Sequence, residues 1–155
     1  MNKYMKKAND LAKYSMDNNK GGCFGSIIVK DGIIVGQGYN TVTSDNDPTC
    51  HGEVNAIRNA CKNLNTFDLS GCELYTSAYP CPMCLGAIMW SNIKLVYYGA
   101  TAQDTENIGF RDDFMYNWIN HKSEDDLKKI EMNRNECVEV QKMWVDKKDK
   151  IEYLL

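Results

Sequence analysis

Four side chains in this chain of 155 residues have the types and the spacing that metal-dependent hydrolysis needs. His51 and Glu53 lie two positions apart, and Cys81 and Cys84 follow 30 and 33 residues after the histidine. Thiolate sulfur and neutral imidazole nitrogen are good zinc ligands, and three protein ligands leave a fourth tetrahedral position open for catalysis. We therefore expect His51, Cys81 and Cys84 to bind one zinc ion, with Glu53 beside it as the proton shuttle.

Each half of this pattern also has a plainer interpretation. A lone Cys-x-x-Cys pair fits a redox pair or two buried cysteines, and a lone His-x-Glu fits a solvated helix start. The joint pattern is more specific, because both halves are expected to begin a helix and Pro80 precedes the first cysteine. A structural zinc site would need a fourth protein ligand, and the sequence offers none at suitable spacing.

The spacing also restricts where these residues can lie. Cys81 and Cys84 at a helix start turn both sulfurs to one side, and the positive end of the helix dipole favours thiolate. Residues two apart do not share a face inside a helix, so His51 and Glu53 can serve one metal only in the first turn. Cys50 is a rival ligand, but adjacent helical residues point about 100° apart, so we expect it to pack beside the site.

Hydrophobic periodicity predicts the elements that position these residues. Two strands around Asp31-Gly32 form a hairpin, and Thr49 is expected to cap the helix that follows the polar loop 40–49. Strands separated by helices imply parallel neighbours, with both ligand-bearing helix starts at one sheet edge. The expected strands are 24–30, 33–38, 73–77, 94–99 and a possible one near 129–132; the expected helices are 3–18, 49–64, 82–91 and 135–147.

The bulk composition is that of one globular domain, residues 1–155. Apolar residues make up 43% and charged residues 25%, and no apolar run approaches the roughly 20 residues that span a bilayer. The basic N-terminus has no apolar run behind it, so we expect a cytoplasmic protein without a secretory signal. A net charge of -3 favours a small substrate and makes nucleic acid an unlikely partner. Seven cysteines, an odd number, argue against a disulfide framework.

The paired motif resembles the cytidine deaminase superfamily, in which His-x-Glu and Pro-Cys-x-x-Cys hold zinc and the glutamate is not a ligand. The resemblance implies an α/β fold with three layers, α/β/α, around a mixed five-stranded sheet. Residues 80–90 (PCPMCLGAIMW) look like the branch that holds bacterial guanine deaminases, fungal cytosine deaminases and tRNA adenosine deaminases. The segments 47–49 (DPT) and 109–116 (GFRDDFMY) and the C-terminal aromatic residue are similar to guanine deaminases in particular.

The same resemblance suggests which residues contact the base. Asn40 and Asp112 correspond to base-reading residues, with an amide and a carboxylate that can answer the donors and acceptors of guanine. The other implied contacts are two aromatic pocket positions, one backbone contact and one residue of the C-terminal tail: Phe24, Trp90, Gly52 and Tyr153. Gly52 stands where the family usually has alanine, and Tyr79 stands where many relatives have an acidic residue, which bears on the exact substrate.

The leading functional hypothesis is therefore hydrolytic deamination of free guanine to xanthine and ammonia. The alternatives are a tRNA adenosine (A to I) deaminase, a cytosine deaminase and, outside the enzymes, a structural zinc module. The resemblance further implies a homodimer in which the tail 151–155 is exchanged and Tyr153 closes the partner's active site. The plainer alternative is that this mostly apolar tail packs on its own domain.

Overall fold

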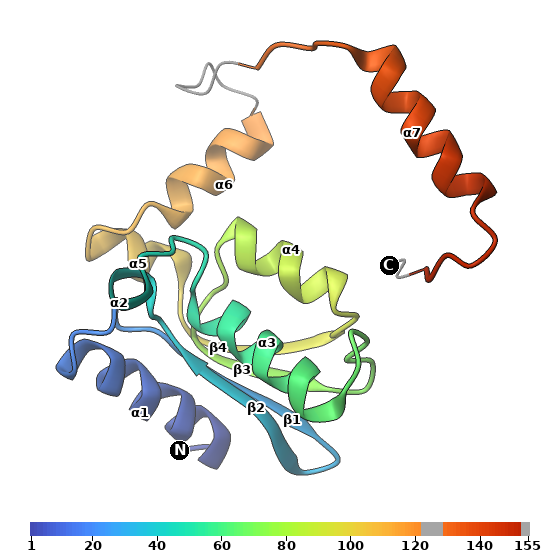
Figure 1. Ribbon diagram of the computed structural model, residues 1–155. Coiled ribbons are helices and arrows are strands. Elements are labelled where there is room, and N and C mark those ends of the chain that lie inside the picture. Colours follow the sequence, from blue (N-terminus) through green and yellow to red (C-terminus); the bar gives the residue numbers. More distant parts are fainter. Residues whose placement is uncertain (122–128, 153–155) are drawn as a thin grey trace.

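A computed structural model describes residues 1–121 and 129–152 (Figure 1). A mixed sheet of four strands lies at its centre, in the order β2-β1-β3-β4. Strand β1 pairs antiparallel with both β2 and β3, and β3 pairs parallel with β4. Asp31 and Gly32 connect β1 to β2 with φ angles of 50° and 77°, as a tight hairpin turn requires. The strands are β1 (Gly25–Lys30), β2 (Ile33–Tyr39), β3 (Glu73–Ala78) and β4 (Leu95–Ala100).

Helices cover both faces of this sheet, which confirms the three-layer α/β/α arrangement (Figure 1). Helix α1 packs on one face, and α3 and α4 pack on the other. The helices of the described residues are α1 (Lys3–Asp17), α2 (Val42–Asp45), α3 (Gly52–Leu64), α4 (Pro82–Trp90), α5 (Ala102–Asn107), α6 (Asp112–His121) and α7 (Arg134–Asp146). None of them is long and apolar enough to cross a membrane.

Two hydrophobic clusters, one on each face, hold the layers together. Successive residues of β1 alternate between them: Ile27 and Val29 join the cluster beside α1, whereas Ile28 joins the cluster beneath α3 and α4. This two-residue alternation is the ordinary geometry of a strand, and burial on both faces explains why β1 is apolar almost throughout.

Three details differ from the expectations. The described residues contain four strands rather than five, and residues 129–132 form no strand. The polar loop contains the short helix α2. Thr49 is not a helix cap, because its backbone N–H and its hydroxyl both donate to the Asp47 carboxylate, at 2.8 and 2.6 Å. The N-cap position of α3 is occupied by His51.

The strand directions bring several connections to one edge of the sheet. Strands β2, β3 and β4 run the same way, since β2 and β3 are each antiparallel to β1. Their carboxyl ends therefore lie together, as expected for the ligand-binding edge of an α/β sheet. Asn40 follows β2, Tyr79 to Cys81 follow β3, and Phe24 immediately precedes β1 at the same edge.

Helix α7 is arranged differently from the rest of the described chain. Figure 1 shows it standing away from the sheet, and none of its residues is buried. Its large apolar side chains are exposed: Val140, Met143, Trp144 and Val145. The predicted helix at 135–147 is therefore confirmed, but it has no packing partner among the described residues of this chain.

Candidate active site

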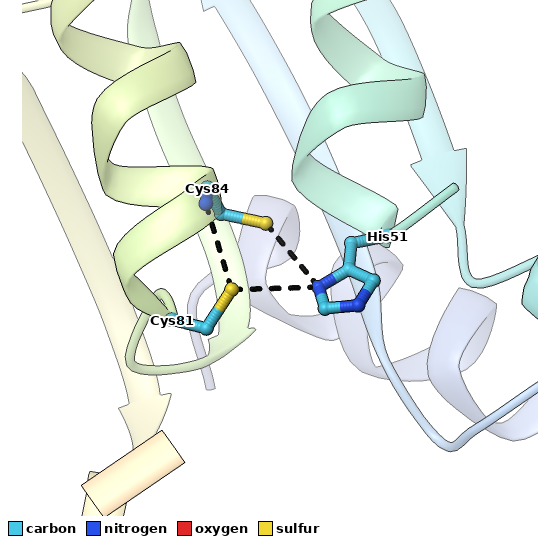
Figure 2. Close-up of side chains that lie close together, drawn as sticks. All are labelled: His51, Cys81 and Cys84. Carbon is cyan, nitrogen blue, oxygen red and sulfur yellow. Dashed lines mark hydrogen bonds between the residues drawn. The ribbon is translucent and has the colours of Figure 1, made fainter. Parts of the chain in front are cut away.

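The three predicted zinc ligands converge at the carboxyl edge of the sheet (Figure 2). The Nδ1 atom of His51 lies 3.5 Å from the Sγ atoms of both Cys81 and Cys84. All three ligand atoms lie within 4.8 Å of one another. Nitrogen and sulfur ligands of one tetrahedral zinc ion are about 3.6 Å apart, given bond lengths near 2.0–2.1 and 2.3 Å. The site therefore fits zinc in both ligand type and geometry.

The helix starts explain how His51 and Glu53 serve one site despite their spacing. His51 has extended backbone angles (φ -74°, ψ 160°) as the N-cap of α3, so it lies outside the helical turn. Glu53 is the second residue inside the helix. The predicted condition, that both lie at the very start of the helix, is met, and both side chains line the same cavity.

The acid–base chemistry of the two thiols also favours a cation. A hydrogen bond from the Cys84 thiol, together with one from His51, lowers the pKa of Cys81 to about 4. The same thiol–thiolate bond raises the pKa of Cys84. Two adjacent buried sulfurs cannot both ionise without a positive charge between them, and a divalent cation supplies that charge.

Glu53 is buried beside the ligands in a small polar network. It is 6% exposed, and burial raises the pKa of its carboxyl. The hydroxyl of Ser26 in β1 lies 3.4 Å from Glu53 Oε1 and 3.0 Å from the hydroxyl of Thr76 in β3. Burial makes the ionised carboxyl a stronger base than it is in water, which suits a group that must take up a proton and pass it on.

Two of the metal ligands, His51 and Cys81, line a cavity together with Glu53. Two phenylalanine rings, Phe24 and Phe110, meet edge to face in its wall with centroids 4.9 Å apart. The lining residues are Phe24, Asn40, His51, Glu53, Ala78, Tyr79, Cys81, Phe110 and Asp112.

Asn40 is held in one orientation. Its Oδ1 atom accepts hydrogen bonds from the backbone N–H groups of Gly22 and Val42, at 3.2 and 3.0 Å. Gly21 lies so close that an added Cβ would be 2.1 Å from the same oxygen. With Oδ1 occupied, the amide presents its Nδ2 group as a donor. Asp112, which lines the same cavity, offers an acceptor, and burial raises the pKa of its carboxyl.

Two other predicted site residues, Trp90 and Gly52, do not line the cavity. Trp90 is at the opposite end of α4 from Cys81, 56% exposed, and borders an apolar groove with Ile57 and Phe67 rather than the cavity. It cannot reach the site within its own chain because α4 leads away from the metal. Gly52 is buried between His51 and Glu53 without lining the cavity. Tyr153 falls outside the described residues.

Cys50 is not part of the metal group, as expected. It is 5% exposed, and its sulfur accepts a hydrogen bond from Arg58 Nη1 at 3.4 Å. All seven cysteines are free, in agreement with the prediction that the chain has no disulfide framework.

Sequence reasoning missed several residues of the site. Phe110 lines the cavity, and only its proximity to Asp112 in the sequence could have suggested it, whereas Tyr79, which was singled out as bearing on the substrate, lines the cavity as well. Ser26 and Thr76 were also missed. Their signal was available, because a hydroxyl residue inside an apolar strand calls for a buried hydrogen-bond partner.

A three-ligand His/Cys/Cys site with a buried glutamate, on an α/β/α fold, defines the class of zinc-dependent deaminases. The chain belongs to the cytidine and deoxycytidylate deaminase family: the family's zinc-binding region matches residues 1–100.

Comparison with individual proteins shows which deaminases this chain is similar to. The chain is 49% identical to guanine deaminase of Bacillus subtilis (strain 168) over 79% of its length and 78% of that protein. It is 36% identical to a tRNA-specific adenosine deaminase of Buchnera aphidicola over 88% of each chain. Among solved structures, guanine deaminase from Bacillus subtilis matches with a TM-score of 0.91 and 42% identity, covering 99% of this chain and 100% of that one. Guanine deaminase from Nitrosomonas europaea matches with a TM-score of 0.66 and 32% identity, over 69% and 62%.

Proposed function

We propose that the protein converts free guanine to xanthine and ammonia by zinc-dependent hydrolysis. The observation that carries this proposal is the placement of a fixed donor and an acceptor, Asn40 and Asp112, in the same cavity as His51, Cys81 and Glu53. Guanine carries ring acceptors and ring N–H donors, so it can satisfy both groups at once. The 49% identity to a guanine deaminase over 79% of the chain, and the structural match to one over 99%, support the same substrate.

His51, Cys81 and Cys84 would hold the zinc ion, which when bound supplies the Lewis acidity that makes water nucleophilic near neutral pH. Glu53 takes the proton of the attacking water and gives it to a ring nitrogen beside the reacting carbon. It then takes the proton of the hydroxyl group now on that carbon and transfers it to the departing amino group, so that the carbon–nitrogen bond breaks, ammonia leaves and a carbonyl forms. The hydrogen-bonded hydroxyl of Ser26 keeps the buried carboxyl in place for these transfers.

The cavity walls and the charge of the chain favour a planar free base. Phe24 and Phe110 line the cavity and present aromatic surfaces to a flat ring. The net charge of -3 also lacks the basic surplus that gives proteins affinity for phosphate backbones. These points support guanine rather than tRNA as the substrate. The cytoplasmic location expected from the sequence stays a prediction.

Deamination of adenosine in tRNA is the second candidate, because several tRNA-specific adenosine deaminases are 36–47% identical over parts of the chain. A single assay separates the candidates. Ammonia release is measured with guanine, adenine, cytosine and a tRNA anticodon stem-loop, each with wild-type protein and with the Glu53→Gln variant. We expect release from guanine that the variant loses. Release from the stem-loop and not from guanine would refute the proposal.

We also propose that the protein is a homodimer in which the C-terminal segment closes the partner's site. Two surfaces support this. Helix α7 buries none of its residues on its own chain, and the edge strand β4 leaves Leu95, Tyr97 and Tyr98 more than 40% exposed. A second copy of the chain could cover both. Analytical ultracentrifugation should show a dimer at micromolar concentration, and a monomer would contradict the proposal.

A further inference from the structure

Helix α6 makes a direct polar contact with the turn that carries the first cysteine ligand. The hydroxyl of Tyr116 donates a hydrogen bond to the backbone carbonyl of Pro80 at 2.5 Å. Pro80 is fully buried and immediately precedes Cys81, the N-cap of α4. The position of that carbonyl is therefore linked through one peptide unit to the position of a metal ligand.

The same face of α6 carries the residue assigned to base recognition. Asp112 and Tyr116 are four residues apart in one helix, so their side chains lie one above the other. Asp112 lines the active-site cavity, while Tyr116 contacts the Pro80 carbonyl beside it. Anchoring the helix at Tyr116 thus limits how far the Asp112 carboxylate can move relative to the metal.

An aromatic cluster surrounds this contact. The ring of Tyr79, which lines the cavity, packs against Tyr116 with centroids 5.9 Å apart and against Tyr98 with centroids 4.9 Å apart. Tyr79 is also fixed through its backbone, whose N–H donates to the Ala100 carbonyl at 2.8 Å. Tyr116 therefore contacts a wall of the cavity as well as the ligand turn, whereas Tyr98 contacts the wall residue and has no hydrogen bond to that turn in the described part of the chain.

We propose that Tyr116 is a positioning residue that couples base recognition to the metal site. Its hydroxyl fixes the Pro80–Cys81 turn for the metal, and through the same hydrogen bond it holds α6 so that Asp112 faces the bound base. The proposal rests on the proposed function in its second half only. The first half, an outer hydrogen bond that orients a metal ligand, concerns zinc retention whatever the substrate is.

The matched variants are Tyr116→Phe and Tyr98→Phe. Each removes one tyrosine hydroxyl from the same aromatic cluster and keeps the ring, so the fold should survive, as a thermal unfolding curve checks. The first readout is the rate at which zinc passes to a chromogenic chelator. We expect the rate to rise about tenfold in Tyr116→Phe, as for the loss of an outer hydrogen bond to a ligand, and to stay near wild type in Tyr98→Phe. Equal rates of zinc release in the two variants would refute the proposal that Tyr116 positions the Pro80–Cys81 turn.

The second readout is a double-mutant cycle with Asp112→Asn, using whichever base the wild-type protein deaminates. We expect Tyr116→Phe to raise KM about five- to tenfold with a much smaller change in kcat, and to have little further effect on KM in the Asp112→Asn background. Full additivity of the two KM effects would show that Tyr116 does not act through Asp112. If guanine is not the substrate but zinc release behaves as expected, the proposed function fails and the positioning of the metal turn stands.

Discussion

His51 and Cys81 occupy equivalent positions in their helices. Each is the N-cap residue with an extended backbone, at ψ angles of 160° and 167°, and each follows the carboxyl edge of the sheet. An N-cap side chain lies beyond the helix end, where backbone N–H groups face it and the helix dipole favours negative charge. In Cys81 this shows directly, because its sulfur accepts from the Cys84 N–H at 3.5 Å. Two helix starts that face each other thus build a metal site without any ligand from a loop interior.

Zinc content should depend on Cys84 and be independent of Cys50. Both are buried cysteines, but only Cys84 belongs to the metal group, whereas Cys50 contacts Arg58. Cys84→Ala should reduce zinc from about one per chain to near zero, because two ligands do not hold the ion in a tetrahedral site. Cys50→Ala should keep full zinc. Metal analysis of the two purified variants checks this, and full zinc in Cys84→Ala would refute the assignment.

Turnover should depend on Glu53 while zinc binding does not. Glu53→Gln keeps the size of the side chain and can still meet the Ser26 hydroxyl, but it can no longer carry a proton. We expect zinc to stay bound and kcat to fall by roughly 100-fold or more. Glu73→Gln is the control and should keep normal turnover. Glu73 is the first residue of β3, so it lies at the opposite end of that strand from the site. Near-normal turnover with full zinc in Glu53→Gln would remove Glu53 from the mechanism.

The donor role of Asn40 can be separated from its structural role. Asn40→Asp keeps oxygens that accept from Gly22 and Val42 but loses the Nδ2 donor, whereas Asn40→Ala loses both. We expect Asn40→Asp to fold normally and to lose about 1–3 kcal/mol of transition-state binding, read as kcat/KM on guanine. Asn40→Ala should in addition unfold at a lower temperature. Unchanged kcat/KM in Asn40→Asp would make Asn40 purely structural.

Local signals in the sequence predicted the parts of the fold that depend on local chemistry. The Asp31-Gly32 hairpin and the start of α4 at Pro82 follow from backbone preferences that need no tertiary context. The metal ligands were also predictable from local features, because their spacing and the two helix starts together determine the geometry of the metal site. The first-turn condition on Glu53 was likewise a local argument, and it held.

Features that depend on tertiary contacts were not predictable in this way. Thr49 is a local exception: it looks like a helix cap, but it bonds the Asp47 side chain two residues away, and the helix begins only after His51. The direction of α4 places Trp90 far from the cavity, and periodicity gives no information on direction. The orientation of Asn40 depends on two backbone N–H groups contributed by separate segments. Residues 129–132 read as a strand, yet a strand needs a neighbour, and the described chain provides none.

The proposed exchange of C-terminal segments between subunits predicts a result that only a mixed dimer can test. Two inactive proteins are prepared, one with Glu53→Ala and one lacking residues 151–155, and both should keep zinc, because neither change touches a ligand. If each tail closes the partner's site, a mixed dimer has one site with an intact Glu53 and an intact tail over it. Equal mixing should then restore about a quarter of wild-type activity, since half of the dimers are mixed and each has one working site. If each tail served its own subunit, every site would lack either Glu53 or its tail, and no activity would return. Mixed dimers demonstrated by mass spectrometry without recovered turnover would therefore contradict the exchange, while recovery that scales with the mixed fraction would establish that the partner's tail completes the site.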